Sequence, residues 1–109
     1  MLQLPMKTIT LRRVVVTGLG AVTDLGTDVD STWEGMVSGR TGIGPITAFE
    51  QDDEWTTRFA GEVKGFDSSH VADVREAKRM DRASLLGLVA AEEAARDCGI
   101  DFASGDPDR

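Results

Sequence analysis

The sequence is poor in cysteine, histidine and basic residues. Its 109 residues include one cysteine and one histidine. This excludes an internal disulfide framework, a cysteine-rich zinc site and any mechanism that needs two histidines from this chain. Lys and Arg number 12 against 19 Asp and Glu, giving a net charge of −7. Because phosphate binding needs a basic surface, this balance argues against nucleic acid as a partner.

Long apolar runs and a secretory leader are also missing. No apolar run approaches the roughly 18 residues of a membrane span. The first residues do not combine a charged region with an apolar one, as a signal peptide does. These absences predict a soluble cytoplasmic chain with no membrane partner. The composition, 40% hydrophobic and 28% charged, is typical of a globular protein, and the length allows one domain.

The first half predicts one strand and one helix after a weakly structured lead-in over residues 1–11. Val14, Val15 and Val16 predict a strand buried on both faces, as in a parallel sheet. A short amphipathic helix should follow, capped by Asp28 or Thr27 and stopped at Gly39. Its apolar face consists of Val29, Trp33, Met36 and Val37.

The second half predicts a strand and a long helix. Residues 41–45 should be loop, and residues 58–64 alternate as a half-buried strand does. A helix is expected over residues 75–98, buried on most sides between residues 83 and 91, which carry no charge. One helical face carries small residues that would let another backbone approach: Ser84, Gly87, Ala91 and Ala95. This order predicts an α/β fold, and two strands indicate part of a sheet rather than a finished one.

The glycines after the first strand resemble a dinucleotide-binding turn only in part. Gly18 and Gly20 are present, but Thr23 stands where a third glycine is required. The predicted helix also starts too late for its N-terminus to face a pyrophosphate. A plain tight turn is therefore favoured, and a small nucleotide-binding domain is kept as an alternative.

Neither of the reactive side chains fits a catalytic role. Cys98 is placed at a helix C-terminus, where the dipole disfavours a thiolate, so it is interpreted as a packing residue. His70 lies in a polar connection and is interpreted as an exposed loop residue. The sequence therefore predicts no catalytic, cofactor-binding or metal-binding residue in this chain.

A basic cluster stands out against the acidic background. Its members are spaced along one side of a helix start: Arg75, Lys78, Arg79 and Arg82. A solvated helix end would explain such a cluster. Cations near a helix N-terminus oppose the dipole, however, which indicates a use other than helix stability. Such a patch can bind an acidic partner, because screening makes local charge decisive at contact.

Seven short segments, taken in order, resemble the N-terminal part of the β-ketoacyl-acyl-carrier-protein synthases, specifically the elongating type II enzymes of fatty-acid synthesis. They are residues 12–20 (RRVVVTGLG), 25–26 (LG), 31–34 (STWE), 38–43 (SGRTGI), 59–63 (FAGEV), 78–82 (KRMDR) and 90–94 (AAEEA). Each is weak alone, but the ordered set is specific to condensing enzymes. It separates fatty-acid enzymes from related polyketide synthases less well.

The resemblance implies a thiolase-like, layered α/β fold, with residues 12–109 as a partial domain that stops before the nucleophile. It implies a parent acyltransferase in which a cysteine accepts an acyl chain and two histidines support decarboxylation of the malonyl donor. Those residues lie further along in the family, so this chain alone is expected to be inactive. No cofactor is implied. The partners implied are acyl carrier protein, carrying acyl or malonyl groups, and a second synthase subunit in a homodimer.

The resemblance also implies a docking site within this chain. In the bacterial elongating enzymes, the basic residues just before the Met-Asp pair contact the acidic carrier protein, and they match Arg75, Lys78 and Arg79. Asp24, where proline is usual, and Ala83, where a larger residue is common, depart from the family pattern. The alternatives kept are a non-catalytic carrier-protein-binding protein and a fragment of a chain-length factor or polyketide synthase.

Overall fold

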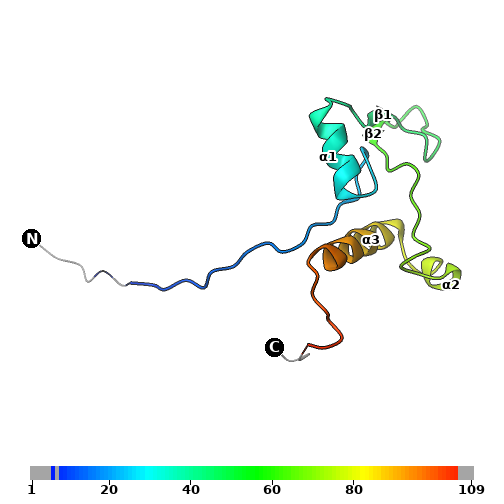
Figure 1. Cartoon of the computed structure of the whole chain (residues 1–109). Helices are drawn as coiled ribbons and strands as arrows, with labels where there is room; N and C mark the ends of the chain where they lie inside the picture. Colours follow the sequence, from blue (N-terminus) through cyan, green and yellow to red (C-terminus); the bar gives the residue numbers. More distant parts are fainter. Residues whose placement is uncertain (1–5, 7, 106–109) are drawn as a thin grey trace, which may run out of the picture.

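The computed structural model describes residues 6 and 8–105 and combines helices with a small sheet in that part of the chain (Figure 1). Of the expected lead-in over residues 1–11, residues 1–5 and 7 lie outside the described residues. In chain order the elements are α1 (Val29–Val37), β1 (Ile43–Pro45), β2 (Phe59–Gly61), α2 (Val74–Ala77) and α3 (Arg82–Asp97). The prediction of a chain with both helices and strands is confirmed.

Helix α1 begins and ends where its sequence signals predict. The Asp28 carboxylate accepts a hydrogen bond from the Ser31 backbone N–H at 2.7 Å, as an N-cap does. Hydrogen bonds from the hydroxyl of Ser31, and secondarily from its backbone N–H, hold the pKa of Asp28 below its ordinary value. The helix stops before Gly39, whose φ of +71° few other residues adopt. Its apolar face is largely exposed, since Trp33 is 64% and Met36 is 59% exposed.

The sheet is a two-stranded antiparallel pair in which Gly44 lies opposite Ala60. The prediction that residues 41–45 form loop is wrong for residues 43–45, because these residues pair with β2. The Glu62 carboxylate stabilises the connection after β1 by accepting the N–H groups of Thr47 and Ala48, each at 2.9 Å. These bonds, with one from the Thr47 hydroxyl, lower the pKa of Glu62.

The predicted helix over residues 75–98 is two helices, so this expectation is wrong. Two aspartates each cap a separate start: Asp73 accepts from the N–H of Glu76, and Asp81 accepts from the N–H of Ser84 at 2.6 Å. Glu76 returns a bond to the Asp73 N–H and completes a capping box. The S/T/D-x-x-E spacing at residues 73–76 was the signal that could have revealed the break.

The loop at residues 18–28 lies against α3, and two glycines make this possible. A Cβ added at Gly18 would collide with the Ala94 carbonyl oxygen, and one added at Gly20 would collide with that of Ala90. The close backbone approach is therefore on the face of Ala90 and Ala94. The small-residue face predicted to allow it is wrong, because the space beside Gly87 is open.

The valine segment before this loop forms no strand, contrary to the prediction. Residues 8–17 run as an extended arm away from the helices (Figure 1). Val14, Val15 and Val16 are 89%, 73% and 78% exposed, respectively. A strand needs neighbouring backbone with which to exchange hydrogen bonds, and none lies beside the arm in the described residues.

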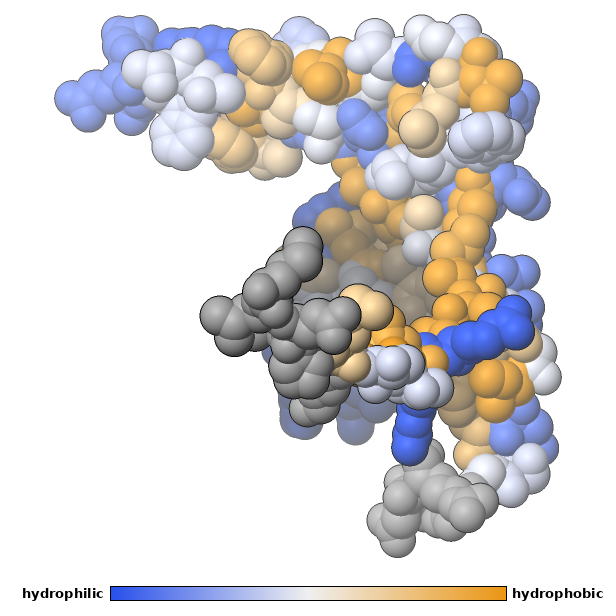
Figure 2. All heavy atoms as spheres, turned by 90° about the vertical axis from the view of Figure 1, so that its left-hand side faces the viewer, coloured by the Kyte–Doolittle hydropathy of each residue, from blue (hydrophilic) through white to orange (hydrophobic). Residues whose placement is uncertain are grey.

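Few side chains are enclosed by the described part of the chain. Of its apolar residues, Ala72 and Val89 are buried, so the predicted burial of the middle of α3 is wrong for most of that stretch. Figure 2 shows hydrophobic residues spread over the visible surface. The accessible surface is 9801 Å², against about 5,900 Å² for a compact chain of this mass. The radius of gyration is 20.9 Å, against about 13 Å for a compact domain.

No helix of the described residues combines the length and apolar character needed to cross a bilayer.

Candidate functional site

The three cations predicted to form a docking site lie on and just after α2, and all three are exposed. Arg75 is the second residue of α2, Lys78 is its C-cap, and Arg79 follows in the next turn. Backbone N–H groups of Lys78 and Arg79 still bond carbonyls of α2, at Val74 and Glu76. The helical spacing therefore continues through Arg79 and places the three cations on one side. We call Arg75, Lys78 and Arg79 the basic group.

The acidic residues of α2 are directed toward its own backbone. The Asp73 carboxylate accepts the N–H groups of Arg75 and Glu76, both at 2.8 Å. The Glu76 carboxylate accepts the Asp73 N–H at 3.0 Å. Each carboxylate thus satisfies a donor at the start of the helix. They are held in place by these bonds rather than by the neighbouring cations.

None of the three cations has an acidic partner within the residues that the structure describes. The ion pair found there joins Glu92 to Arg96, and the His70 ring lies 3.9 Å from the same carboxylate. The side chains of the basic group make no hydrogen bond in that part of the chain either. Their charge remains available to an external anion, which would bind without first breaking an internal pair.

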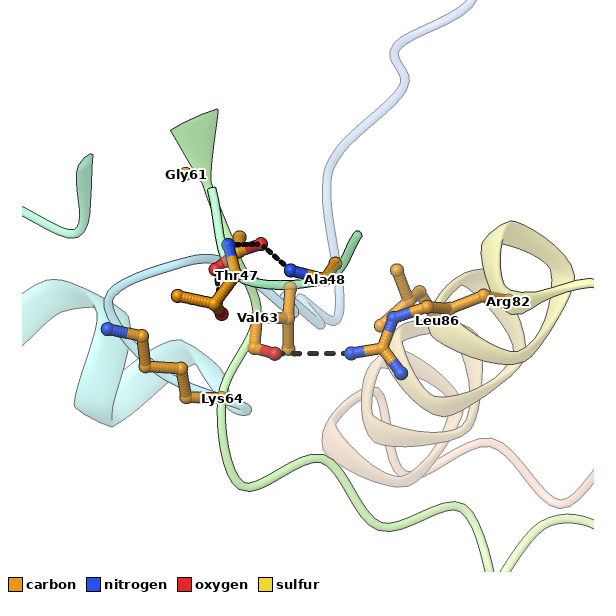
Figure 3. Close-up of a pocket in the computed structure, with 8 residues that line it drawn as sticks. Thr47, Ala48, Gly61, Val63, Lys64, Arg82 and Leu86 are labelled. Carbon is orange, nitrogen blue, oxygen red and sulfur yellow. Dashed lines mark hydrogen bonds between the residues drawn. The ribbon is translucent and has the colours of Figure 1, made fainter. Parts of the chain in front are cut away.

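Arg82, the fourth cation of the cluster, has a different role. Its guanidinium donates to the Val63 carbonyl at 3.1 Å and lies 5.5 Å from the ring centroid of Phe66. Figure 3 shows this side chain reaching from α3 to the segment after β2, beside Leu86. Arg82 therefore joins two parts of the fold and does not belong with the basic group.

The helix break changes the electrostatic argument for the cluster. Lys78 and Arg79 lie at the C-terminal end of α2, where the helix dipole favours cations. The prediction that the whole cluster opposes a helix N-terminus is therefore wrong for these two residues. What distinguishes them is their lack of internal partners.

The glycine loop has its anion-binding groups occupied from within. The Leu19 N–H donates to Asp97 at 2.9 Å. The N–H groups of Ala21 and Val29 donate to the two oxygens of Glu93, each at 2.9 Å. Carboxylates of α3 thus stand where a phosphate would bind to a glycine-rich turn and helix N-terminus. A nucleotide would have to displace both, which argues against the nucleotide-binding alternative.

The two reactive side chains lie where the sequence places them. Cys98 is the C-cap of α3 and its thiol contacts the Ala95 carbonyl at 3.0 Å. His70 lies in a turn with its side chain 47% exposed. The two therefore show no nucleophile-and-base arrangement.

Comparison with known proteins identifies the family. The β-ketoacyl synthase N-terminal domain model matches residues 11–109. A Synechocystis protein, 3-oxoacyl-[acyl-carrier-protein] synthase 2, is 47% identical over 89 residues, covering 82% of this chain and 21% of the relative. The Staphylococcus aureus (strain COL) protein of the same name is 40% identical over 98 residues, covering 90% and 23%. The chain thus spans about a fifth of the length of these relatives. It belongs to the β-ketoacyl synthase N-terminal domain family.

Proposed function

We propose that the chain is part of a 3-oxoacyl-[acyl-carrier-protein] synthase II of fatty-acid elongation. The proposal rests on the family match over residues 11–109 and on relatives of that name at 40% and 47% identity. In the reaction, malonyl-acyl carrier protein loses its carboxyl group as CO₂. The carbanion that remains attacks the carbonyl carbon of an acyl thioester held on the enzyme's cysteine, the C–S bond breaks, the cysteine leaves as a thiolate, and the product is 3-oxoacyl-acyl carrier protein. The nucleophile and histidines for these steps belong to a part of the synthase that this chain does not include.

The open surfaces of the chain support a place within a larger fold. A thiolase-like enzyme stacks sheets and helices in layers, so an apolar segment of one part is covered by another. Val14, Val15 and Val16 are apolar and exposed, as an inner strand without its neighbours would be. We propose that the complete synthase covers this segment within a layered α/β fold and assembles as a homodimer.

Docking of acyl carrier protein is the contribution we assign to this chain itself. One observation supports it: Arg75, Lys78 and Arg79 are exposed together and have no acidic partner among the described residues. Unpaired cations attract an acidic protein and orient it on approach. The carrier would then lie against α2 while its acyl group enters the rest of the synthase.

A condensation assay on the full-length synthase tests the docking assignment. Changing Arg75, Lys78 and Arg79 together to Glu should raise KM for malonyl-acyl carrier protein about tenfold or more. Activity toward a small thioester that lacks the carrier should stay unchanged. A matched control compares KM for malonyl-acyl carrier protein in two double variants, Arg75→Glu/Arg79→Glu and Arg12→Glu/Arg13→Glu. The second variant makes the same change in charge outside the basic group, so it should raise KM less than the first. Unchanged KM for the carrier substrate would contradict the assignment.

The 109-residue chain by itself should give no product, and measurable product would contradict the claim that it lacks the catalytic residues.

A further inference from the structure

A mostly apolar hollow lies directly beside the basic group. It has a volume of about 490 Å³ and lies between α2 and the segment at residues 67–69. Ala72, Val74 and Ala77 supply its apolar lining, and Lys78 also lines it. Val74 is 73% exposed, so its side chain is available for contact from outside. Its volume lies within the range of small ligand pockets, so the hollow is large enough to receive an apolar side chain of a partner.

The hollow and the basic group share one residue. Val74, Ala77 and Lys78 are spaced i, i+3 and i+4, so they follow one stripe along the helix. The members of the basic group, from Arg75 to Arg79, have the same spacing one residue later. The two stripes therefore run side by side and meet at Lys78. A partner that contacts one stripe lies within reach of the other.

The acidic side chains at the hollow are engaged with their own backbone. The Asp67 carboxylate accepts the Ser69 N–H at 2.9 Å and the Ser69 hydroxyl at 3.0 Å. Asp73 is the N-cap of α2. Lys78 has no such bond from its side chain. Lys78 can therefore meet an approaching carboxylate without rearrangement, while Asp67 and Asp73, which also line the hollow, have carboxylate oxygens engaged by local donors.

We propose that this hollow receives one apolar side chain from an acidic helix that the basic group attracts. The proposal rests on the docking function and specifies its partner: a helix that carries an apolar residue beside its carboxylates. Charge complementarity favours this occupant over a neutral apolar one, because Lys78 lines the hollow and Arg75 and Arg79 lie on the neighbouring stripe of the same helix. Exposed ion pairs contribute little affinity by themselves, so the apolar contact would supply much of the retention after encounter.

The experiment measures binding of fluorescently labelled acyl carrier protein to the 109-residue chain by anisotropy, at about 50 mM and about 1 M salt. Val74→Ser should weaken binding roughly three- to tenfold. This factor should be similar at both salt concentrations, because the contact it removes is apolar. Val74→Leu, which keeps an apolar side chain, should bind as the unchanged chain does. Val37→Ser is the matched control, since Val37 is 67% exposed on α1. Circular dichroism of each variant checks that helix content is retained.

The charge-reversed basic group separates this inference from the docking function. Arg75→Glu/Lys78→Glu/Arg79→Glu should weaken binding strongly at low salt and less at high salt, because 1 M salt screens charges beyond about 3 Å. If this variant weakens binding but Val74→Ser does not, the hollow is unoccupied and the inference is wrong, while docking by the basic group stands. If charge reversal has no effect at low salt, both are wrong.

Discussion

Residues 18–28 and residues 8–17 adjoin in the sequence, yet the first segment is held by α3 and the second is open to solvent. Two backbone N–H groups of the first segment, those of Leu19 and Ala21, donate to Asp97 and Glu93, and so does that of Val29 directly after it, to Glu93. Gly18 and Gly20 let its backbone lie close to that of α3. The second segment makes no backbone hydrogen bond among the described residues, and its valines are exposed.

The two segments differ in whether the chain supplies a bonding partner for them, and not in how strongly their own residues favour a structure. The run of valines is a stronger structural signal than the irregular loop after it. A loop that meets complementary carboxylates is nevertheless fixed, whereas an apolar strand without neighbours gains nothing from its propensity. The loop should therefore be sensitive to substitution and the arm should be tolerant.

The largest effect is expected at Gly20. Gly20→Ala adds a Cβ that would collide with the Ala90 carbonyl. Because backbone atoms cannot easily give way, we expect a loss of about 2–3 kcal/mol in the free energy of unfolding. Gly87→Ala is the matched control: the space there is open, and the change should stabilise α3 by up to about 1 kcal/mol. Urea unfolding followed by circular dichroism measures both. Equal effects would show that the loop does not lie against α3.

A smaller loss is expected when the carboxylate that holds the loop is removed. Glu93→Ala leaves the N–H groups of Ala21 and Val29 without their acceptor. The expected cost is about 1–3 kcal/mol, since both bonds are part-buried and involve a charged group. Glu92→Ala, which removes an exposed ion pair with Arg96, should cost less than about 1 kcal/mol. If the two variants unfold at the same urea concentration, Glu93 does not hold the loop.

Acidification should weaken the start of α1. The folded pKa of Asp28 lies below its ordinary value of 3.8, so its cap stabilises the folded state above that value. The contribution is lost as pH falls from about 3.8 through the lowered folded pKa. Asp28→Asn keeps a capping oxygen that does not titrate, so this variant should lose less helix between pH 5 and pH 2.5. Circular dichroism at 222 nm reports the difference, and identical acid profiles would contradict the role of the carboxylate.

The smallest effect on unfolding is expected in the arm. Val15→Thr keeps the β-branched shape and should change the free energy of unfolding by less than about 0.5 kcal/mol, because Val15 is exposed. It should also slow aggregation measured by light scattering, because an unpaired apolar strand pairs readily with other chains. A large loss of stability would mean that the arm is packed within this chain.

Local signals predicted much of the fold, whereas features that depend on a distant partner were missed. Asp28 and Gly39 marked the ends of α1 correctly because caps act over a few residues. The strand at residues 43–45 could not be predicted from its own Gly and Pro content, because it forms by pairing with residues 59–61. The predicted strand of valines failed for the opposite reason, since no partner for it lies in the described residues.

The candidate site was predicted partly by spacing and partly by resemblance. Helical spacing grouped the cations, but spacing alone could not separate Arg82 from Arg75, Lys78 and Arg79. The separation depends on the Val63 carbonyl and the Phe66 ring, which the fold brings to Arg82. The occupation of the glycine loop by Glu93 and Asp97 was likewise hidden, because 64 or more positions separate each donor from its acceptor.

The most direct test of the docking claim is a titration of unlabelled acyl carrier protein into the ¹⁵N-labelled chain, followed by NMR. The account predicts that the amide signals that change are concentrated between residues 73 and 80, around Arg75, Lys78 and Arg79. It also predicts that these changes disappear in the charge-reversed variant. Signals that change only elsewhere, such as at residues 18–28, or no change at saturating carrier protein, would contradict it.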